Sequence, residues 1–100
     1  MNKLAQDSSI PSLLREVESN LALSNTVDLE VDARELACPL PLLKARQALR
    51  NLAVKQAVRV LATDAGSLKD FVSYAQLTGQ LIEGFCVQDN YYCFVIRKQS

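Results

Sequence analysis

A cysteine followed by two prolines is the feature of this sequence that could do chemistry. Cys38, Pro39 and Pro41 lie between a predicted strand and the first turn of a predicted helix. The free N–H groups and partial positive charge of a helix start stabilise a thiolate. Such surroundings lower a cysteine pKa from about 8.5 to roughly 3.5–7.5. The prolines also restrict the backbone. The sequence therefore predicts that Cys38 is an exposed, anionic nucleophile.

Charged residues flank this cysteine. Arg34 and Lys44 are close enough in sequence to add positive potential at the sulfur. Asp32 precedes the helix. An aspartate at such a position most often has a capping role, and it could also steer a partner. We expect Arg34 and Asp32 to tune the cysteine and help to present it.

The composition excludes several other kinds of site. The chain has 100 residues, enough for one domain, and no histidine, so Ser-His-Asp, Cys-His and His-ligated zinc sites are absent. Eleven basic and eleven acidic residues give zero net charge, which argues against direct nucleic-acid or anionic membrane binding. No apolar run approaches the roughly 20 residues that span a bilayer. Three cysteines without a secretory pattern predict reduced thiols in the cytoplasm. No bound metal is expected, since a zinc site needs about four clustered ligands.

Hydrophobic periodicity predicts the elements that position Cys38. Strands are expected at 26–32, 57–62, 81–87 and 91–97, and helices at 42–52 and 68–75. The last two strands are joined at Asp89-Asn90, a pair suited to a tight hairpin, and Gly79 suits the end of the second helix. The order is β-α-β-α-β-β. We therefore predict an α/β two-layer sandwich, with a four-stranded mixed sheet and two helices on one face.

Residues 1–25 form a predicted N-terminal extension to a domain at 26–100. Apolar residues at positions 10, 13, 14, 17 and 21 have helical spacing, and Pro11 and Ser12 suit a helix start. This pattern predicts one short amphipathic helix. Such a helix would either pack on the domain or dock a partner.

Two residue pairs in the domain have more specific predictions. Ser67 and Asp70 fit a capping box, in which both side chains bind backbone amides at the start of the second helix. In a two-residue hairpin, Cys86 lies opposite Cys93 at a hydrogen-bonded position, where the Cα separation of about 5.5 Å permits a disulfide. We expect both thiols to stay reduced in the cytoplasm.

Over residues 27–98, about three-quarters of its length, the chain resembles the TusA/SirA-like family of small sulfur-carrier proteins. The Cys-Pro-x-Pro motif and the strand and helix order carry this resemblance. The matching residues are Asp32, Cys38, Pro39, Pro41, Asp64 and Asp70. The resemblance implies that Cys38 accepts sulfane sulfur as a transient persulfide from a cysteine desulfurase or rhodanese-like donor. It then passes this sulfur to a downstream acceptor protein, as a sulfurtransferase that needs no cofactor.

The resemblance also implies a docking surface formed by Leu43, Arg46 and Asp64. This chain departs from the family pattern at Glu35, where many members have glycine, and in its N-terminal extension. Two alternatives remain open. In one, Cys38 is a buried structural residue of a binding or regulatory module. In the other, Cys38 forms a peroxide or disulfide sensor with one of the hairpin thiols.

Overall fold

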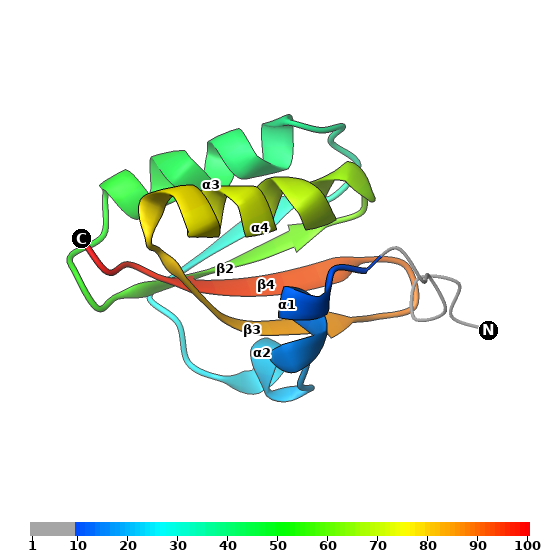
Figure 1. Cartoon of the computed structure of the whole chain (residues 1–100), viewed down its shortest axis with the longest axis horizontal. Coiled ribbons are helices and arrows are strands. Elements are labelled where there is room, and N and C mark those ends of the chain that lie inside the picture. Colours follow the sequence, from blue (N-terminus) through cyan, green and yellow to red (C-terminus); the bar gives the residue numbers. More distant parts are fainter. Residues whose placement is uncertain (1–9) are drawn as a thin grey trace.

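The computed structural model describes residues 10–100, whose four main strands form one sheet beneath a layer of helices (Figure 1). The elements are α1 (Ser12–Glu16), α2 (Leu21–Ser24), β1 (Leu29–Ala33), α3 (Leu40–Arg50), β2 (Ala57–Ala62), α4 (Gly66–Thr78), β3 (Leu81–Val87) and β4 (Tyr92–Arg97). The strand order is β1-β2-β4-β3, with β1 parallel to β2 and the other neighbours antiparallel. α3 and α4 cover one face of the sheet (Figure 1). The predicted α/β fold is confirmed.

Both long helices form where the periodicity predicts them. α3 buries Ala45, Ala48 and Leu49, and Pro41 lies in its first turn, where a missing N–H costs nothing. α4 ends at Gly79, whose φ of 79° is the left-handed conformation that glycine adopts most easily. No helix within residues 10–100 combines the length and apolar character needed to cross a bilayer.

Aromatic rings fill the space between the helices and the sheet. Phe71 of α4 stacks on Phe94 of β4 with ring centroids 4.4 Å apart, and Phe85 lies 5.3 Å from Phe94. All three side chains are fully buried. Each contributes roughly 1.5–3 kcal/mol by leaving water, and an aromatic pair adds about 0.5–1.5 kcal/mol. This cluster fixes α4 on the sheet and so fixes the position of its first turns.

The β3–β4 hairpin has the predicted register. Cys86 pairs with Cys93, and the amide of Gln88 donates to the Tyr91 carbonyl at 2.8 Å. Both cysteines are free and buried, in a small apolar cluster on the sheet face opposite α3 and α4.

The N-terminal segment differs from its prediction, because two short helices replace the single helix. The chain between them pairs with the edge strand β3, where Glu18 bridges Phe85. The Ser19 amide donates to the Phe85 carbonyl at 2.8 Å, and the Phe85 amide donates to the Val17 carbonyl at 3.2 Å. An edge strand leaves these groups unpaired, and pairing them competes with continuing a marginal helix. Leu21, predicted to be in the apolar stripe, is consequently 59% exposed.

Residues 10–25 thereby wrap around the β3 edge of the sheet. α1 packs against α4 and β3, whereas α2 packs on the opposite face against β3 and β4. Figure 1 shows both helices beside β3. Arg59 of β2 holds this segment by donating to the backbone carbonyls of Ala22, at 2.9 Å, and Asn25, and it pairs with Glu30 at 3.0 Å. Residues 1–9 of the predicted extension lie outside the described residues.

Candidate active site around Cys38

Cys38 lies in the connection between β1 and α3, at the carboxyl end of the two parallel strands. Its side chain is exposed, and Pro39 is the residue that precedes the first turn of α3. The following helix, α4, begins directly after β2 at the same end of the sheet. The first turns of α3 and α4 therefore meet at Cys38. The exposure of the sulfur agrees with the predicted nucleophile and not with a buried structural residue.

Two carboxylates hold the cysteine. The Cys38 thiol donates to Oδ2 of Asp70 at 2.5 Å. The Cys38 amide donates to Oδ2 of Asp64 at 3.2 Å, and the Gly66 amide donates to the same oxygen at 3.1 Å. Gly66 is needed here because of close packing, since a Cβ at this position would lie 3.0 Å from the Cys38 Cβ. Asp64 thus orients the loop, and Asp70 contacts the sulfur.

The predicted capping box at Ser67 and Asp70 is wrong. α4 begins at Gly66, so Ser67 is already inside its first turn, and the side chain that accepts from the first helical amide is that of Asp64. The Ser67 hydroxyl is buried without a hydrogen-bond partner among residues 10–100. Asp70 points to the thiol, because the turn that begins α4 lies against the Cys38 loop. A side chain interpreted as a local cap is therefore part of the candidate site.

The predicted lowering of the Cys38 pKa is also wrong. The hydrogen bond to Asp70 raises the pKa of Cys38 to about 11, and partial desolvation and the negative charges of Asp70 and Asp64 act in the same direction. A hydrogen bond from the neutral thiol and nearby carboxylates both favour the protonated form. The resting side chain is a thiol rather than a thiolate.

Arg34 is paired with Asp32 instead of with the cysteine. Its guanidinium donates to the two Asp32 oxygens at 2.9 and 2.8 Å, and it lies 5.2 Å above the Tyr91 ring. This hydrogen-bonded pair lowers the pKa of Asp32 to about 2. Within residues 10–100, neither Arg34 nor Lys44 is hydrogen-bonded to Cys38. The pair instead closes the turn after β1, where the Arg34 amide also binds Asp32 at 3.1 Å.

Glu35 occupies a strained turn next to the site. Its φ of 72° is in the left-handed region, which is costly for residues other than glycine. Its amide donates to the Thr63 hydroxyl at 2.9 Å, which ties the β1–α3 connection to the end of β2. The departure from glycine thus places a carboxylate beside the turn at a conformational cost of about 1–2 kcal/mol.

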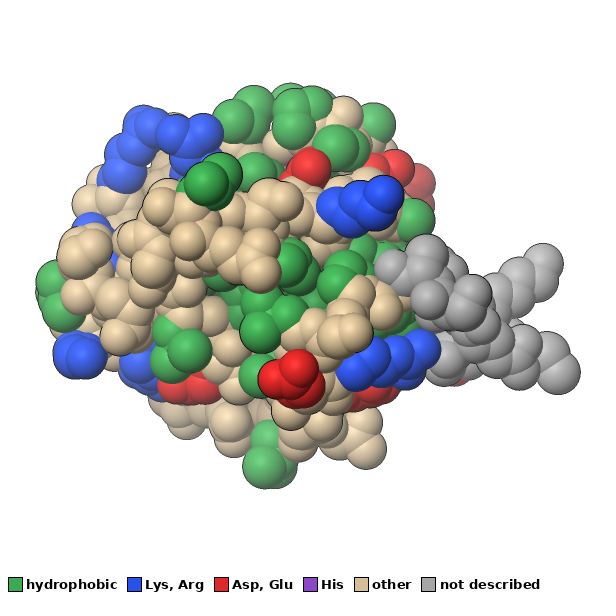
Figure 2. Space-filling model, viewed as in Figure 1, with side chains coloured by type: hydrophobic (Ala, Val, Ile, Leu, Met, Phe, Trp, Pro, Cys, Tyr) green, Lys and Arg blue, Asp and Glu red, His purple; other side chains and the backbone are tan. Residues whose placement is uncertain are grey.

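The predicted docking residues lie on two sides of Cys38. Leu43 is 46% exposed on α3, and the neighbouring Leu40 is 45% exposed. Figure 2 shows hydrophobic side chains gathered along the α3 edge of the molecule. Arg46 lies one turn further along α3, whereas Asp64 is on the other side of the cysteine and binds its amide. Only Asp64 of these three has a hydrogen bond to Cys38.

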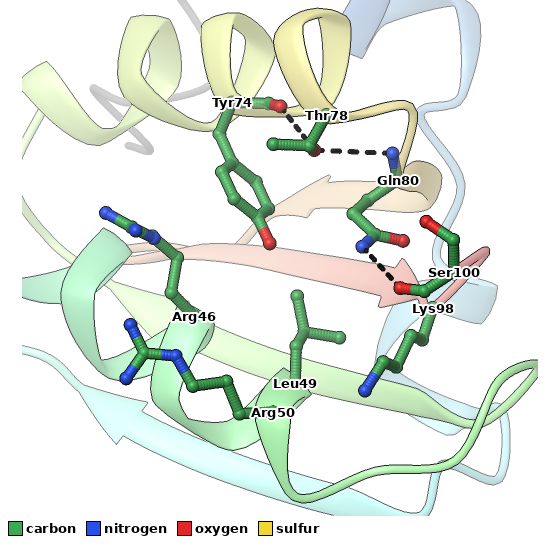
Figure 3. Close-up of a pocket in the computed structure, with 8 residues that line it drawn as sticks. All are labelled: Arg46, Leu49, Arg50, Tyr74, Thr78, Gln80, Lys98 and Ser100. Atoms are coloured by element: carbon green, nitrogen blue, oxygen red, sulfur yellow. Dashed lines mark hydrogen bonds between the residues drawn. The ribbon is translucent and has the colours of Figure 1, made fainter.

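A groove between α3 and α4 leads away from the site. Asp70, Leu42, Tyr74 and Leu77 line a depression of about 340 Å³ that also includes Arg46. A further depression of about 260 Å³ continues it at Arg46 and Tyr74 (Figure 3). The side chains in Figure 3 come from both helices, the α4–β3 connection and the C-terminal segment, and they are Arg46, Leu49, Arg50, Tyr74, Thr78, Gln80, Lys98 and Ser100. The groove is therefore carboxylate-bearing near the sulfur and basic at its far end.

Comparison with known proteins gives the same class of protein as the sequence resemblance. The family model described as "Sulfurtransferase TusA" matches residues 29–98. The sulfur carrier protein TusA of Allochromatium vinosum is 39% identical over 71 residues, which are 71% of this chain and 93% of the relative. A putative sulfur carrier protein of Neisseria meningitidis is 34% identical over 67 residues, which are 67% of this chain and 90% of the relative.

A solved structure shares the fold. The SirA-like protein of Desulfitobacterium hafniense aligns with a TM-score of 0.64 at 24% identity, over 72% of this chain and 99% of that chain.

The fold and the exposed cysteine between two carboxylates define a small α/β thiol protein. The chain belongs to the TusA sulfurtransferase family, as the Cys-Pro-x-Pro resemblance predicted. It is a sulfur carrier that acts in a sulfur relay. The match begins at residue 29, so the wrapping segment of residues 10–25 lies outside it.

Proposed function

We propose that Cys38 is the residue that carries the sulfur, as a transient persulfide, and that the protein is a sulfurtransferase in this sense. The observation that supports this most is the exposed thiol held at the junction of α3 and α4 by Asp70 and Asp64. Cys86 and Cys93 are buried and do not offer a sulfur that another protein could reach.

The reaction needs only sulfur atoms and a proton. The Cys38 sulfur bonds to the terminal sulfur of a donor persulfide, and the donor's sulfur–sulfur bond breaks with its electron pair left on the donor cysteine. Cys38 loses its thiol proton, and the donor cysteine leaves as a thiolate. In the second transfer, an acceptor thiolate takes the terminal sulfur and Cys38 is the leaving group. No metal or organic cofactor takes part in either step.

The residues around Cys38 have two roles: some hold the loop that presents the sulfur, and others form a surface on which partner proteins dock. Pro39, Pro41 and the Asp32–Arg34 pair hold the loop that presents the sulfur. Two protein partners follow from the relay, namely a donor of the cysteine desulfurase or rhodanese-like class and a downstream acceptor.

The surface around α3 supports docking of these proteins. Leu43 and Arg46 supply an exposed apolar and basic face beside the cysteine, and Asp64 lies on its other side. The zero net charge supports protein partners rather than nucleic acid. An exposed thiol supports a location in the reducing cytoplasm.

A two-stage sulfur-transfer experiment tests this function. The protein is first incubated with a cysteine desulfurase and L-cysteine, and intact mass is measured. Wild type should gain the mass of one sulfur, and the Cys86→Ser variant should gain it equally. Cys38→Ser should gain none. In the second stage, a thiol acceptor protein added to the purified loaded carrier should remove that mass. Loading of Cys38→Ser equal to wild type would refute the assignment of Cys38.

A further inference from the structure

Asp70 is the group best placed to handle the proton of the Cys38 thiol. Its Oδ2 accepts the thiol hydrogen bond at 2.5 Å. Asp70 lies in the second turn of α4, a helix anchored on the sheet by Phe71. Among residues 10–100, no lysine or arginine forms a salt bridge with Asp70. The carboxylate is therefore directed at the sulfur and not occupied by a fixed cation.

The carboxylates make a stored thiolate unfavourable, so the proton must leave during the reaction itself. Asp64 and Asp70 both disfavour an anionic Cys38 sulfur. Arg46 of α3 is the basic residue that lines the same groove as Asp70. A nucleophile that rests in its neutral form is activated by an adjacent base within about 2.6–3.2 Å. At 2.5 Å, the Cys38–Asp70 contact is slightly shorter than this range, and the carboxylate is within reach of the thiol proton.

We infer that Asp70 is the proton acceptor and donor for Cys38 in both sulfur-transfer steps, an inference that rests on Cys38 being the carrier. During loading, the Cys38 sulfur bonds to the terminal sulfur of the donor persulfide and the thiol proton passes to Asp70. The donor cysteine leaves with the electron pair of the broken bond. During unloading, an acceptor thiolate bonds to the terminal sulfur, the bond to Cys38 breaks, and the proton returns from Asp70 to the Cys38 sulfur.

Asp64 has a different part in the site. Its Oδ2 is hydrogen-bonded to the amides of Cys38 and Gly66 and is not hydrogen-bonded to the sulfur. Asp64 is therefore a positioning residue for the loop. Asp70 is a catalytic residue, since it contacts the reacting atom.

The Asp70→Asn variant distinguishes two possible roles of Asp70. In one, Asp70 is a base that takes the thiol proton; in the other, its negative charge only disfavours the thiolate. Removing the charge should increase alkylation of Cys38 by iodoacetamide near neutral pH by about tenfold, because more thiolate is present although each thiolate is less nucleophilic. Loss of the base should slow loading from a small-molecule persulfide by about tenfold or more. A small donor is used because Asp70 lines the groove and could affect docking. Ser73→Ala, in the same groove, is the matched control and should change neither rate.

Asp70→Glu and wild type give the second measurements. Asp70→Glu keeps the carboxylate and should load faster than Asp70→Asn. In wild type, alkylation should rise by about a hundredfold from about pH 7 to about pH 9, whereas loading should rise much less, since a base replaces the need for thiolate. Alkylation and loading that both accelerate in Asp70→Asn would overturn the inference, as would unchanged alkylation. Absence of loading on Cys38 in wild type would instead refute the proposed function.

Discussion

Replacing Gly66 by alanine disturbs the packing that holds the site together. The added Cβ would lie 2.8 Å from Oδ2 of Asp64 and 3.0 Å from the Cys38 Cβ. The Asp64 carboxylate moves more easily than the Cys38 Cβ. We therefore expect the carboxylate to lose its hydrogen bonds to the amides of Cys38 and Gly66. The Cys38 loop then shifts by a few tenths of an ångström, which lengthens its contact with Asp70.

The magnitude follows from two opposing changes, weaker hydrogen bonding to Asp64 and a better helix former at position 66. Each amide–carboxylate hydrogen bond contributes about 1.5–3 kcal/mol, reduced here because water reaches both amides. Alanine in place of glycine returns up to about 1 kcal/mol of helix propensity. We expect Gly66→Ala to lower the free energy of unfolding by about 1–2 kcal/mol, which is a decrease in Tm of roughly 5–15 °C for a domain of this size.

Thermal unfolding followed by circular dichroism measures this change, and the rate of Cys38 alkylation reports on the site. The alkylation rate near neutral pH should rise, since a longer contact with Asp70 disfavours the thiolate less. Gly84→Ala is the matched control, because its added Cβ would meet Ala22 at an ordinary 3.4 Å. A Gly66→Ala protein as stable as wild type, with unchanged alkylation, would show that the cradle around Cys38 is not packed as described.

Two further predictions concern the wrapping segment and the turn after β1. Arg59→Ala removes the donors that hold two carbonyls of residues 10–25, and urea unfolding should show a loss of about 2–4 kcal/mol with faster proteolysis of that segment. Unchanged proteolysis would contradict this attachment. Arg34 lowers the pKa of Asp32 from 3.8 to about 2, so their pairing stabilises the fold above about pH 4 and is lost as the pH falls toward 2. Asp32→Asn should remove this part of the acid sensitivity; identical acid unfolding curves would refute it.

Local patterns predicted most of the fold. Strand β2 spans the predicted residues 57–62, because a short apolar run bounded by polar residues has the length of a strand and is too short for a typical helix. The hairpin register followed from the Asp89-Asn90 turn, and it correctly placed Cys86 opposite Cys93. Gly79 ends α4 as predicted. In each case, neighbouring residues determine the structure.

The errors occurred where distant segments meet. The N-terminal helix is interrupted because residues near Glu18 pair with β3, a partner that no local pattern shows. Asp70 is 32 positions from Cys38, and its spacing from Ser67 gave a plausible local interpretation that the tertiary contact overrides. The wrong direction of the Cys38 pKa had the same origin, since the prediction rested on the helix start and on basic residues close in sequence, and the carboxylates that raise the pKa are distant in sequence.

The topology contained a usable indication of the site. Adjacent parallel strands bring their carboxyl ends together, so the helices that follow β1 and β2 must begin side by side. An acidic residue at the start of α4 is therefore expected to lie near Cys38. The same argument places the carboxylates of Asp64 and Asp70 near the thiol and accounts for their effect on its pKa.

Peptide-level mass spectrometry of the loaded protein tests the central claim most directly. After reaction with a desulfurase and L-cysteine, persulfides are trapped by alkylation and the modified cysteine is located. We predict that the additional sulfur is on Cys38 and that the peptides containing Cys86 and Cys93 are unmodified. Sulfur found on either hairpin cysteine, or on none of the three, would contradict the account.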